Sequence, residues 1–307
     1  MPHVRDRRTG QPYAEPVLGG GWMGAVYGAS WRRRLAAPLF RTSWATRFLG
    51  WLADRPASAR RIPGVVDQLR IDVAECVTPS GGFGCFNDFF ARRLKPGARP
   101  WDPAMGAIVS PSDCRMTVFP DGPVAAGLPV KGASFTPAEL LGAAGSQWAS
   151  RFAAGPAVVA RLCPADYHRF HFPLAGRVLA AWTVPGIYDS VHPLALALGV
   201  PVFKDNVRQV TVLETTAGLV AFVEVGAFGV ARIVQTHGGA EFNKMDEKGY
   251  FAFGGSTVVL LFESGRLELA ADLLRNSTEG WETRVLAGET IAHVGLCPRP
   301  RSRNSVP

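Results

Sequence analysis

A serine that follows two glycines, Ser256 after Gly254 and Gly255, opens an apolar run that ends at Phe262. The glycines carry no side chain that would shield the preceding carbonyl, and they allow a tight turn at this point. The β-branched and aliphatic residues that follow favour a strand. We therefore predict a serine on a tight turn before a strand, with a hydroxyl that attacks the carbonyl of Gly255 in its own backbone.

Length and composition are those of a folded protein with a sizeable core. The 307 residues are 47% hydrophobic and 19% charged, with 34 glycines and 24 prolines, which argues against disorder and fibrous repeats. No apolar stretch reaches the roughly 20 residues that a membrane-spanning helix needs. The cysteines form no CxxC pair and are odd in number, which indicates free thiols in a reducing compartment and no structural zinc site. They are Cys76, Cys85, Cys114, Cys163 and Cys297.

Most of the net charge of +8 lies in one window near the N-terminus, between Trp22 and Arg61. The window holds eight arginines against one acid, a net charge of +7, and four of the eight tryptophans. The aromatic residues have the spacing of an amphipathic helix, which suits the headgroup layer of anionic lipid. Nucleic acid is an alternative partner, and helices packed on the core with solvated arginines are another. We favour lipid, with contributions from Arg32, Arg33 and Arg34.

The pattern of the sequence changes near residue 108, from helical segments to short strands. Two or three helices are expected between residues 22 and 77, and a further short helix at 86–94. Strands are expected at 178–183, 209–214, 219–225, 231–236, 257–262 and 283–287, with a hairpin turn at 216–218 and a helix at 137–141 capped by Thr136. The expected fold class is α+β: a helical basic N-terminal region (residues 1–80) followed by a largely antiparallel β-sandwich or barrel-like core (residues 81–307).

Two of the six histidines, His168 and His171, lie three residues apart. On a helix or turn both rings would point the same way, whereas on a strand they would face opposite sides. A metal site is disfavoured because no acidic ligand motif accompanies them, and a buried structural pair is the alternative. Asp113 follows a strand-like segment and, taken alone, is typical of a turn.

Five segments, taken in order, give the chain a resemblance to the phosphatidylserine decarboxylase proenzymes. They are FNDFFARRLKPGARP at 86–100, SPSD at 110–113, VKG at 130–132, DYHRFH at 166–171 and GYFAFGGST at 249–257. A lone Gly-Ser-Thr is a weak signal, whereas five motifs in this order are a specific one. The resemblance implies a proenzyme that cleaves itself between Gly255 and Ser256, into a β chain (1–255) and an α chain (256–307). It also implies that Ser256 becomes a pyruvoyl group, the only cofactor.

The resemblance also implies roles for residues of this chain. A serine hydroxyl needs a base, and the base needs a group that fixes its tautomer; His171 is then the base and Asp113 orients it. The attack gives an ester, loss of the Ser256 Cα proton releases the upstream chain as a carboxylate, and hydrolysis of the dehydroalanine leaves the pyruvoyl group. The family often has glycine after the aspartate, where this chain has Cys114, a difference that concerns the turn and not the carboxylate.

The implied reaction converts phosphatidylserine to phosphatidylethanolamine, a step of phospholipid biosynthesis. The pyruvoyl ketone would form a Schiff base with the substrate amine and accept the electrons that carbon dioxide leaves behind. Reprotonation of the α-carbon needs an acid, for which we favour His168 over His171. The implied partners are the lipid, an anionic membrane surface on the cytoplasmic face of the cell membrane, and the two self-derived chains. No nucleic acid and no metal are expected, and a homo-oligomer is left open.

Two other functions remain open on the sequence. A pyruvoyl-dependent decarboxylase of a free amino acid would use the same chemistry, but it would not need the basic, tryptophan-rich window. A non-enzymatic binding module could keep the β core, but it would not need the four residues of the expected site together. These residues are Asp113, His168, His171 and Ser256.

Overall fold

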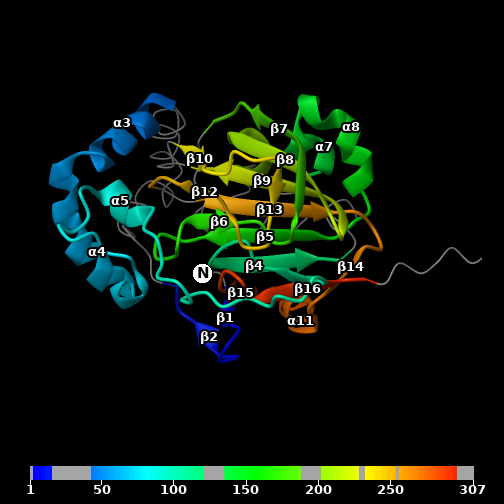
Figure 1. Ribbon diagram of the computed structural model, residues 1–307, viewed down its shortest axis with the longest axis horizontal. Helices are drawn as coiled ribbons and strands as arrows, with labels where there is room; N and C mark the ends of the chain where they lie inside the picture. Colours follow the sequence, from blue (N-terminus) through cyan, green and yellow to red (C-terminus); the bar gives the residue numbers. More distant parts are fainter. Residues whose placement is uncertain are drawn as a thin grey trace, which may run out of the picture.

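The computed structural model describes residues 3–15, 43–120, 135–187, 202–227, 232–253 and 256–295. Within them a ten-stranded sheet runs through the molecule (Figure 1). Its strands are antiparallel except for the β1–β15 pair. In spatial order they are β11 (Glu241–Phe242), β7 (Gly176–Val184), β8 (Arg208–Thr215), β9 (Gly218–Gly226), β13 (Ser256–Phe262), β5 (Ala157–Leu162), β4 (Cys114–Phe119), β15 (Glu282–Val285), β1 (Val4–Asp6) and β2 (Pro12–Tyr13).

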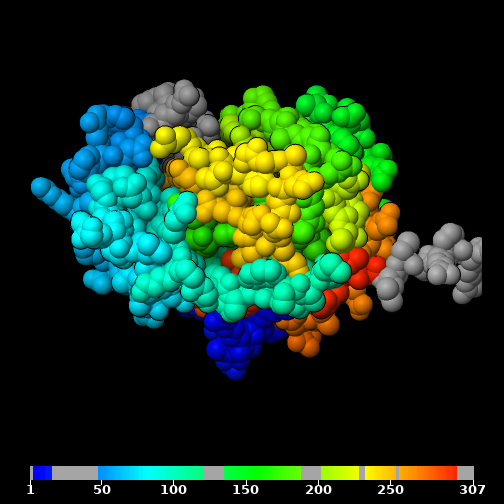
Figure 2. All heavy atoms as spheres, in the orientation of Figure 1, coloured from blue at the N-terminus to red at the C-terminus, as the bar shows by residue number. Residues whose placement is uncertain are grey.

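Two three-stranded sheets and one helix pack on one face of this large sheet. The first small sheet has the order β10 (Ile233–Gln235), β12 (Glu247–Phe251), β6 (Arg169–His171), and the second β14 (Leu267–Leu269), β16 (Thr290–Val294), β3 (Ala107–Val109). Helix α11 (Ala271–Thr278) lies beside β4 and β15. Phe170 of β6 and Phe251 of β12 share an apolar cluster with Val258 of β13, and Figure 2 shows the yellow segment around β10 and β12 covering this side.

The opposite face of the large sheet is covered by short helices. They are α7 (Pro137–Leu141), η3 (Ala143–Gly145), α8 (Ser146–Ala149), η4 (Ser150–Phe152) and α10 (Val202–Asp205). Leu140 and Phe203 from these helices pack with Val259 of β13. Every residue of β13 is buried, so the strand is covered on both faces. Because successive strand residues face opposite sides, Ser256 lies on the same face as Val258.

A third group of helices lies at the end of the sheet where β13 begins (Figure 1). It comprises α3 (Ser43–Ala53), η1 (Pro56–Arg61), α4 (Ile62–Leu69), η2 (Val73–Glu75) and α5 (Phe86–Phe90). Phe253, which precedes β13, packs edge-on against Phe86 and Phe90 of α5, with ring centroids 4.9 and 5.3 Å apart. These contacts bring the N-terminal helices next to Ser256.

The coarse fold prediction is confirmed: the chain is α+β, with mostly antiparallel sheets and few helices. The described strands form no closed barrel, and the sandwich arrangement stays a prediction. The six expected strands, the hairpin turn at 216–218 and the helix capped by Thr136 are present. The helix expected at 86–94 ends at Phe90, and two strands near the N-terminus, β1 and β2, were not expected.

Several predictions fall partly outside the described residues. Residues 16–42, which include Arg32, Arg33 and Arg34, are among those not described, as is Cys297. The other four cysteines are buried free thiols. None of the described helices is long and apolar enough to cross a membrane, and the described His, Cys, Asp and Glu residues form no group of three suited to a metal.

Candidate active site

Ser256 is the first residue of β13, at the centre of the large sheet. It lies opposite Leu162 of β5 and Gly226 of β9, and it is fully buried. Gly226 puts no side chain beside it. The Ser256 Oγ has no hydrogen-bond partner among the residues that the structure describes, although buried polar atoms nearly always have one. Gly254 and Gly255 are outside the described residues. The described chain therefore ends at Phe253 before the expected cleavage site and resumes at Ser256 after it.

His168 lies on the face of the sheet to which Ser256 points, just before β6. Its Nδ1 lies 2.9 Å from the Asp166 carbonyl, so Nδ1 carries the proton and Nε2 keeps its lone pair. The Nε2 atom is buried without a partner. The ring lies against Phe90, with centroids 3.9 Å apart. Burial and the nearby Arg92 cation lower the pKa of His168 to about 3, so the imidazole is neutral.

His171, in β6, has the same tautomer held by a different carbonyl. Its Nδ1 lies 3.0 Å from the Met245 carbonyl oxygen, and its Nε2 lies 3.3 Å from the Tyr167 hydroxyl. Met245 reaches this position with φ of 66°, a left-handed conformation that is unusual for a residue with a side chain. Burial lowers the pKa of His171 as well. Both histidines therefore present Nε2 as a proton acceptor.

Asp113 is bound by an arginine and not by a histidine. Arg99 Nε and Nη2 donate to its two carboxylate oxygens at 2.9 and 2.7 Å, and the Ala287 N–H donates at 2.9 Å. A buried carboxylate needs such partners because burial without them is costly. Among the described residues no hydrogen bond joins Asp113 to His171. The group that fixes the His171 tautomer is the Met245 carbonyl, and the charge of Asp113 acts on both histidines by offsetting part of the lowering of their pKa values by burial.

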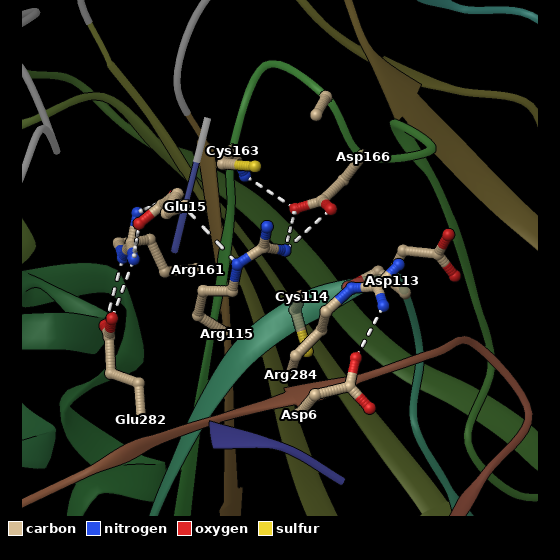
Figure 3. A network of polar contacts seen from close by, with 12 residues as sticks. Asp6, Glu15, Asp113, Cys114, Arg115, Arg161, Cys163, Asp166, Glu282 and Arg284 are labelled. Carbon is tan, nitrogen blue, oxygen red and sulfur yellow. Dashed lines mark hydrogen bonds and ion pairs between the residues drawn. The ribbon is translucent and has the colours of Figure 1, made fainter. Parts of the chain in front are cut away.

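A buried ion pair holds the turn that carries His168. Arg115 Nη1 donates to both carboxylate oxygens of Asp166 at 2.7 and 2.8 Å, and the Cys163 N–H donates to the same carboxylate at 2.8 Å (Figure 3). The carbonyl of Asp166 is the acceptor for His168 Nδ1. Arg115 therefore orients His168 indirectly, through the side chain and then the backbone of Asp166.

The structure brings Asp113, His168 and His171 close enough for the charge of Asp113 to act on both rings, and each of the three has a different hydrogen-bond partner. Arg99 and Asp166 lie inside motifs that support the resemblance, yet the sequence alone gives them no role. The available signal was a charged residue in each of these motifs, which could have suggested an ion-pair partner for another site residue. Met245 gave no signal at all, because it contributes its carbonyl rather than its side chain.

The residues around Ser256 fit a pyruvoyl group formed in place. Among the described residues, Ser256 Oγ and His168 Nε2 are both buried without a hydrogen-bond partner, and a substrate amine bound at position 256 would supply a donor for His168 Nε2. A separate cavity of about 330 Å³ lies over β7 and β8. Its lining includes Trp182, Gln209, Gln235 and Lys248 and none of the four expected site residues.

Comparisons with known proteins agree with the resemblance. The family model for phosphatidylserine decarboxylase matches residues 86–293. The phosphatidylserine decarboxylase proenzyme of Chlamydia felis is 39% identical over 288 residues, which cover 93% of this chain and 96% of the relative. That of Ruminiclostridium cellulolyticum is 36% identical over 296 residues, covering 95% and 98%. With a match of this extent across the segment that holds Asp113, both histidines and Ser256, the chain belongs to the phosphatidylserine decarboxylase family.

Proposed function

We propose that Ser256 attacks the carbonyl of Gly255 and becomes the pyruvoyl group of a self-processed decarboxylase that converts phosphatidylserine to phosphatidylethanolamine. The observation that carries this proposal is the Ser256 Oγ, which is buried without a partner at the start of the central strand. The Thr257 hydroxyl also lacks a partner, but it points to the opposite face of the sheet. Ser256 alone combines an unbonded hydroxyl, a preceding pair of glycines and the histidine-bearing face.

His171 is the base for this attack. Its Nε2 keeps a lone pair because Nδ1 donates to the Met245 carbonyl, and the nearby Asp113 charge stabilises the imidazolium that forms when Nε2 takes the serine proton. The ester then loses the Ser256 Cα proton and releases residues 1–255 as a carboxylate. Hydrolysis frees ammonia and leaves the pyruvoyl group at the start of residues 256–307.

His168 serves the decarboxylation. The pyruvoyl group supplies a ketone that captures the substrate amine and draws in the electron pair left by carbon dioxide. His168 Nε2 takes the proton that the substrate ammonium gives up and returns it to the α-carbon. A substrate carboxylate beside His168 favours this proton uptake, since a nearby negative charge raises the pKa of the imidazole. Phe90 packs on His168 and Phe253 packs on Phe90, and these rings keep water from the reacting groups.

A surface on α3 suits the lipid that holds the substrate. Trp51 and Leu52 lie three and four residues after Phe48, on one face of the helix, and Phe48, Trp51 and Leu52 are 52%, 48% and 41% exposed. Arg55 lies over the Trp51 ring at 3.9 Å, and Arg60 and Arg61 follow on the surface. Exposed aromatic residues with arginines match the headgroup layer of an anionic membrane. Within residues 1–80, helix α3 and the arginines after it thus act as a peripheral docking region at the cytoplasmic face, whereas β1 and β2 join the large sheet of the catalytic domain, residues 81–307.

Denaturing electrophoresis of the purified chain and of Ser256→Ala tests the cleavage. The native chain should give two fragments and Ser256→Ala one intact, inactive chain. Release of carbon dioxide from carboxyl-labelled phosphatidylserine vesicles, with free serine as the control substrate, tests the reaction. Cleavage that continues in Ser256→Ala, or equal turnover of free serine, would refute the proposal.

A further inference from the structure

Asn87 connects the end of helix α3 to the backbone that leads into the expected cleavage site. The residue lies in α5 and is buried. Its Oδ1 accepts a hydrogen bond from the Phe253 N–H at 2.8 Å, and its Nδ2 donates to Asp54 Oδ1 at 2.7 Å. Asp54 directly follows α3, and two residues separate Phe253 from Ser256.

The partners of Asn87 fix the direction of its amide. One partner is an N–H and the other a carboxylate, so a reversed amide would set donor against donor and acceptor against acceptor. Nδ2 also reaches the Gly50 carbonyl at 3.4 Å, inside α3. The negative charge of Asp54 strengthens the bond from Nδ2 and polarises the amide toward Phe253.

Three successive N–H groups before the two glycines are each bound by a different element. The Phe251 N–H donates to the His168 carbonyl at 3.0 Å, and the Ala252 N–H donates to the Arg232 carbonyl at 3.1 Å. Phe253 is the last of the three, and its acceptor is the Asn87 side chain. Arg232 Nη2 also lies 3.2 Å from an Asp54 carboxylate oxygen. Asp54 therefore contacts both Asn87 and Arg232, the residues that accept from the Phe253 and Ala252 N–H groups.

We propose that Asn87 is a positioning residue for self-cleavage, acting on the Phe253 backbone to present the Gly255 carbonyl to Ser256. Glycine has the largest backbone freedom to lose, and ordering it opposes a productive geometry. An anchor at Phe253 leaves only the two glycines between fixed points, which favours a near-attack geometry. The inference rests on the cleavage proposed above, and it adds a residue to which no role has been given.

The first test compares processing rates in Asn87 variants. The chain is made by cell-free synthesis, and conversion of precursor to fragments is followed by quantitative electrophoresis. Asn87→Ala should slow conversion about tenfold, the effect of losing one hydrogen bond of ordinary strength. The melting temperature of each variant is measured in the Ser256→Ala background, in which no cleavage interferes.

A reciprocal exchange separates the proposed relay from general damage. Asn87→Asp places a second carboxylate against Asp54, so conversion should slow at neutral pH. As the pH falls, the rate of this variant should approach that of the wild type measured at the same pH, because one of the two carboxyl groups then carries a proton and donates it. Asn87→Asp combined with Asp54→Asn restores a donor at 54 and an acceptor at 87, and should return the rate to within about threefold of wild type.

Ser58→Ala is the matched control. Ser58 Oγ accepts from the Phe86 N–H at 2.8 Å and donates to the Ala53 carbonyl at 2.9 Å, so it joins the same two helices without touching Phe253. It should lower the melting temperature and leave the processing rate unchanged. The inference is overturned if Asn87→Ala processes at the wild-type rate, if it slows no more than Ser58→Ala, or if the exchange is no faster than its single variants. A wild-type chain that never cleaves overturns the proposed function instead.

Discussion

Arg99 binds both carboxylate oxygens of Asp113, at 2.9 and 2.7 Å, in the position where a histidine was expected. Asp113→Asn removes the charge that balances this arginine and supports His171. Breaking a buried pair by removing one partner costs about 3 kcal/mol, so urea unfolding of the Ser256→Ala precursor should show that loss. Self-cleavage should stall in the chain that retains Ser256. A loss below about 1 kcal/mol, typical of an exposed pair, together with normal cleavage would contradict this role.

The two histidines should separate into two functions. His171→Ala removes the base and should leave an uncleaved chain. His168→Ala should cleave, since His168 is not needed for the attack, but should release little carbon dioxide from phosphatidylserine. Electrophoresis measures the first step and carbon dioxide release the second. Full turnover by His168→Ala would exclude it as the proton donor, and normal cleavage by His171→Ala would exclude it as the base.

The stability of the precursor should fall as the pH falls below neutral. The pKa of His168 is about 3 in the folded chain, against about 6.5 in an unfolded one. The unfolded state therefore binds the proton first, so stability is lost from about pH 6.5 down to about pH 3, and this group contributes about 2 kcal/mol of loss between pH 7 and pH 5. Urea unfolding of Ser256→Ala at the two pH values measures it.

His168→Gln in the same background is the control for this loss, because glutamine does not titrate. The pKa of His171 is also lowered, so some pH dependence should remain. The difference between the two proteins isolates His168. An equal loss in both would show that His168 is not buried as a neutral ring.

The exposed face of α3 should govern vesicle binding. Replacing both Phe48 and Trp51 with Ser removes apolar area that is about half exposed, and should weaken sedimentation with anionic vesicles about tenfold. Met105→Ser is the control, since Met105 is 84% exposed and lies in a loop outside the N-terminal helices. Self-cleavage should be unchanged in both variants. Equal sedimentation of the α3 variant and the native chain would remove α3 from the docking surface.

The strands, and the position of the candidate nucleophile at the start of one of them, could be predicted because their signals are local. Alternating or continuous apolar runs, such as the one after Ser256, define β13 in the sequence itself. The helix at 137–141 was predictable for the same reason, since Thr136 accepts from the Glu139 N–H and both lie within one turn. The region from residue 3 to 15 was not, because β1 forms by pairing with β15, nearly the whole chain away.

The partners within the site depend on tertiary structure and could not be predicted. Asp113, a turn aspartate in the sequence, is bound to Arg99 only because the fold buries both together. The Met245 carbonyl reaches His171 across 74 positions, and any residue type offers a carbonyl. Motif order therefore gave the candidates for the reacting residues, while the residues that orient them required the structure.

The most direct test of the central claim is the intact mass of the purified chain beside that of Ser256→Ala. The account predicts two species from the native chain, residues 1–255 and residues 256–307, with the second lighter by one ammonia than its sequence and reactive toward hydrazines. Ser256→Ala should give one unmodified species of 307 residues. A single unmodified species from the native chain, active on phosphatidylserine, would contradict the account.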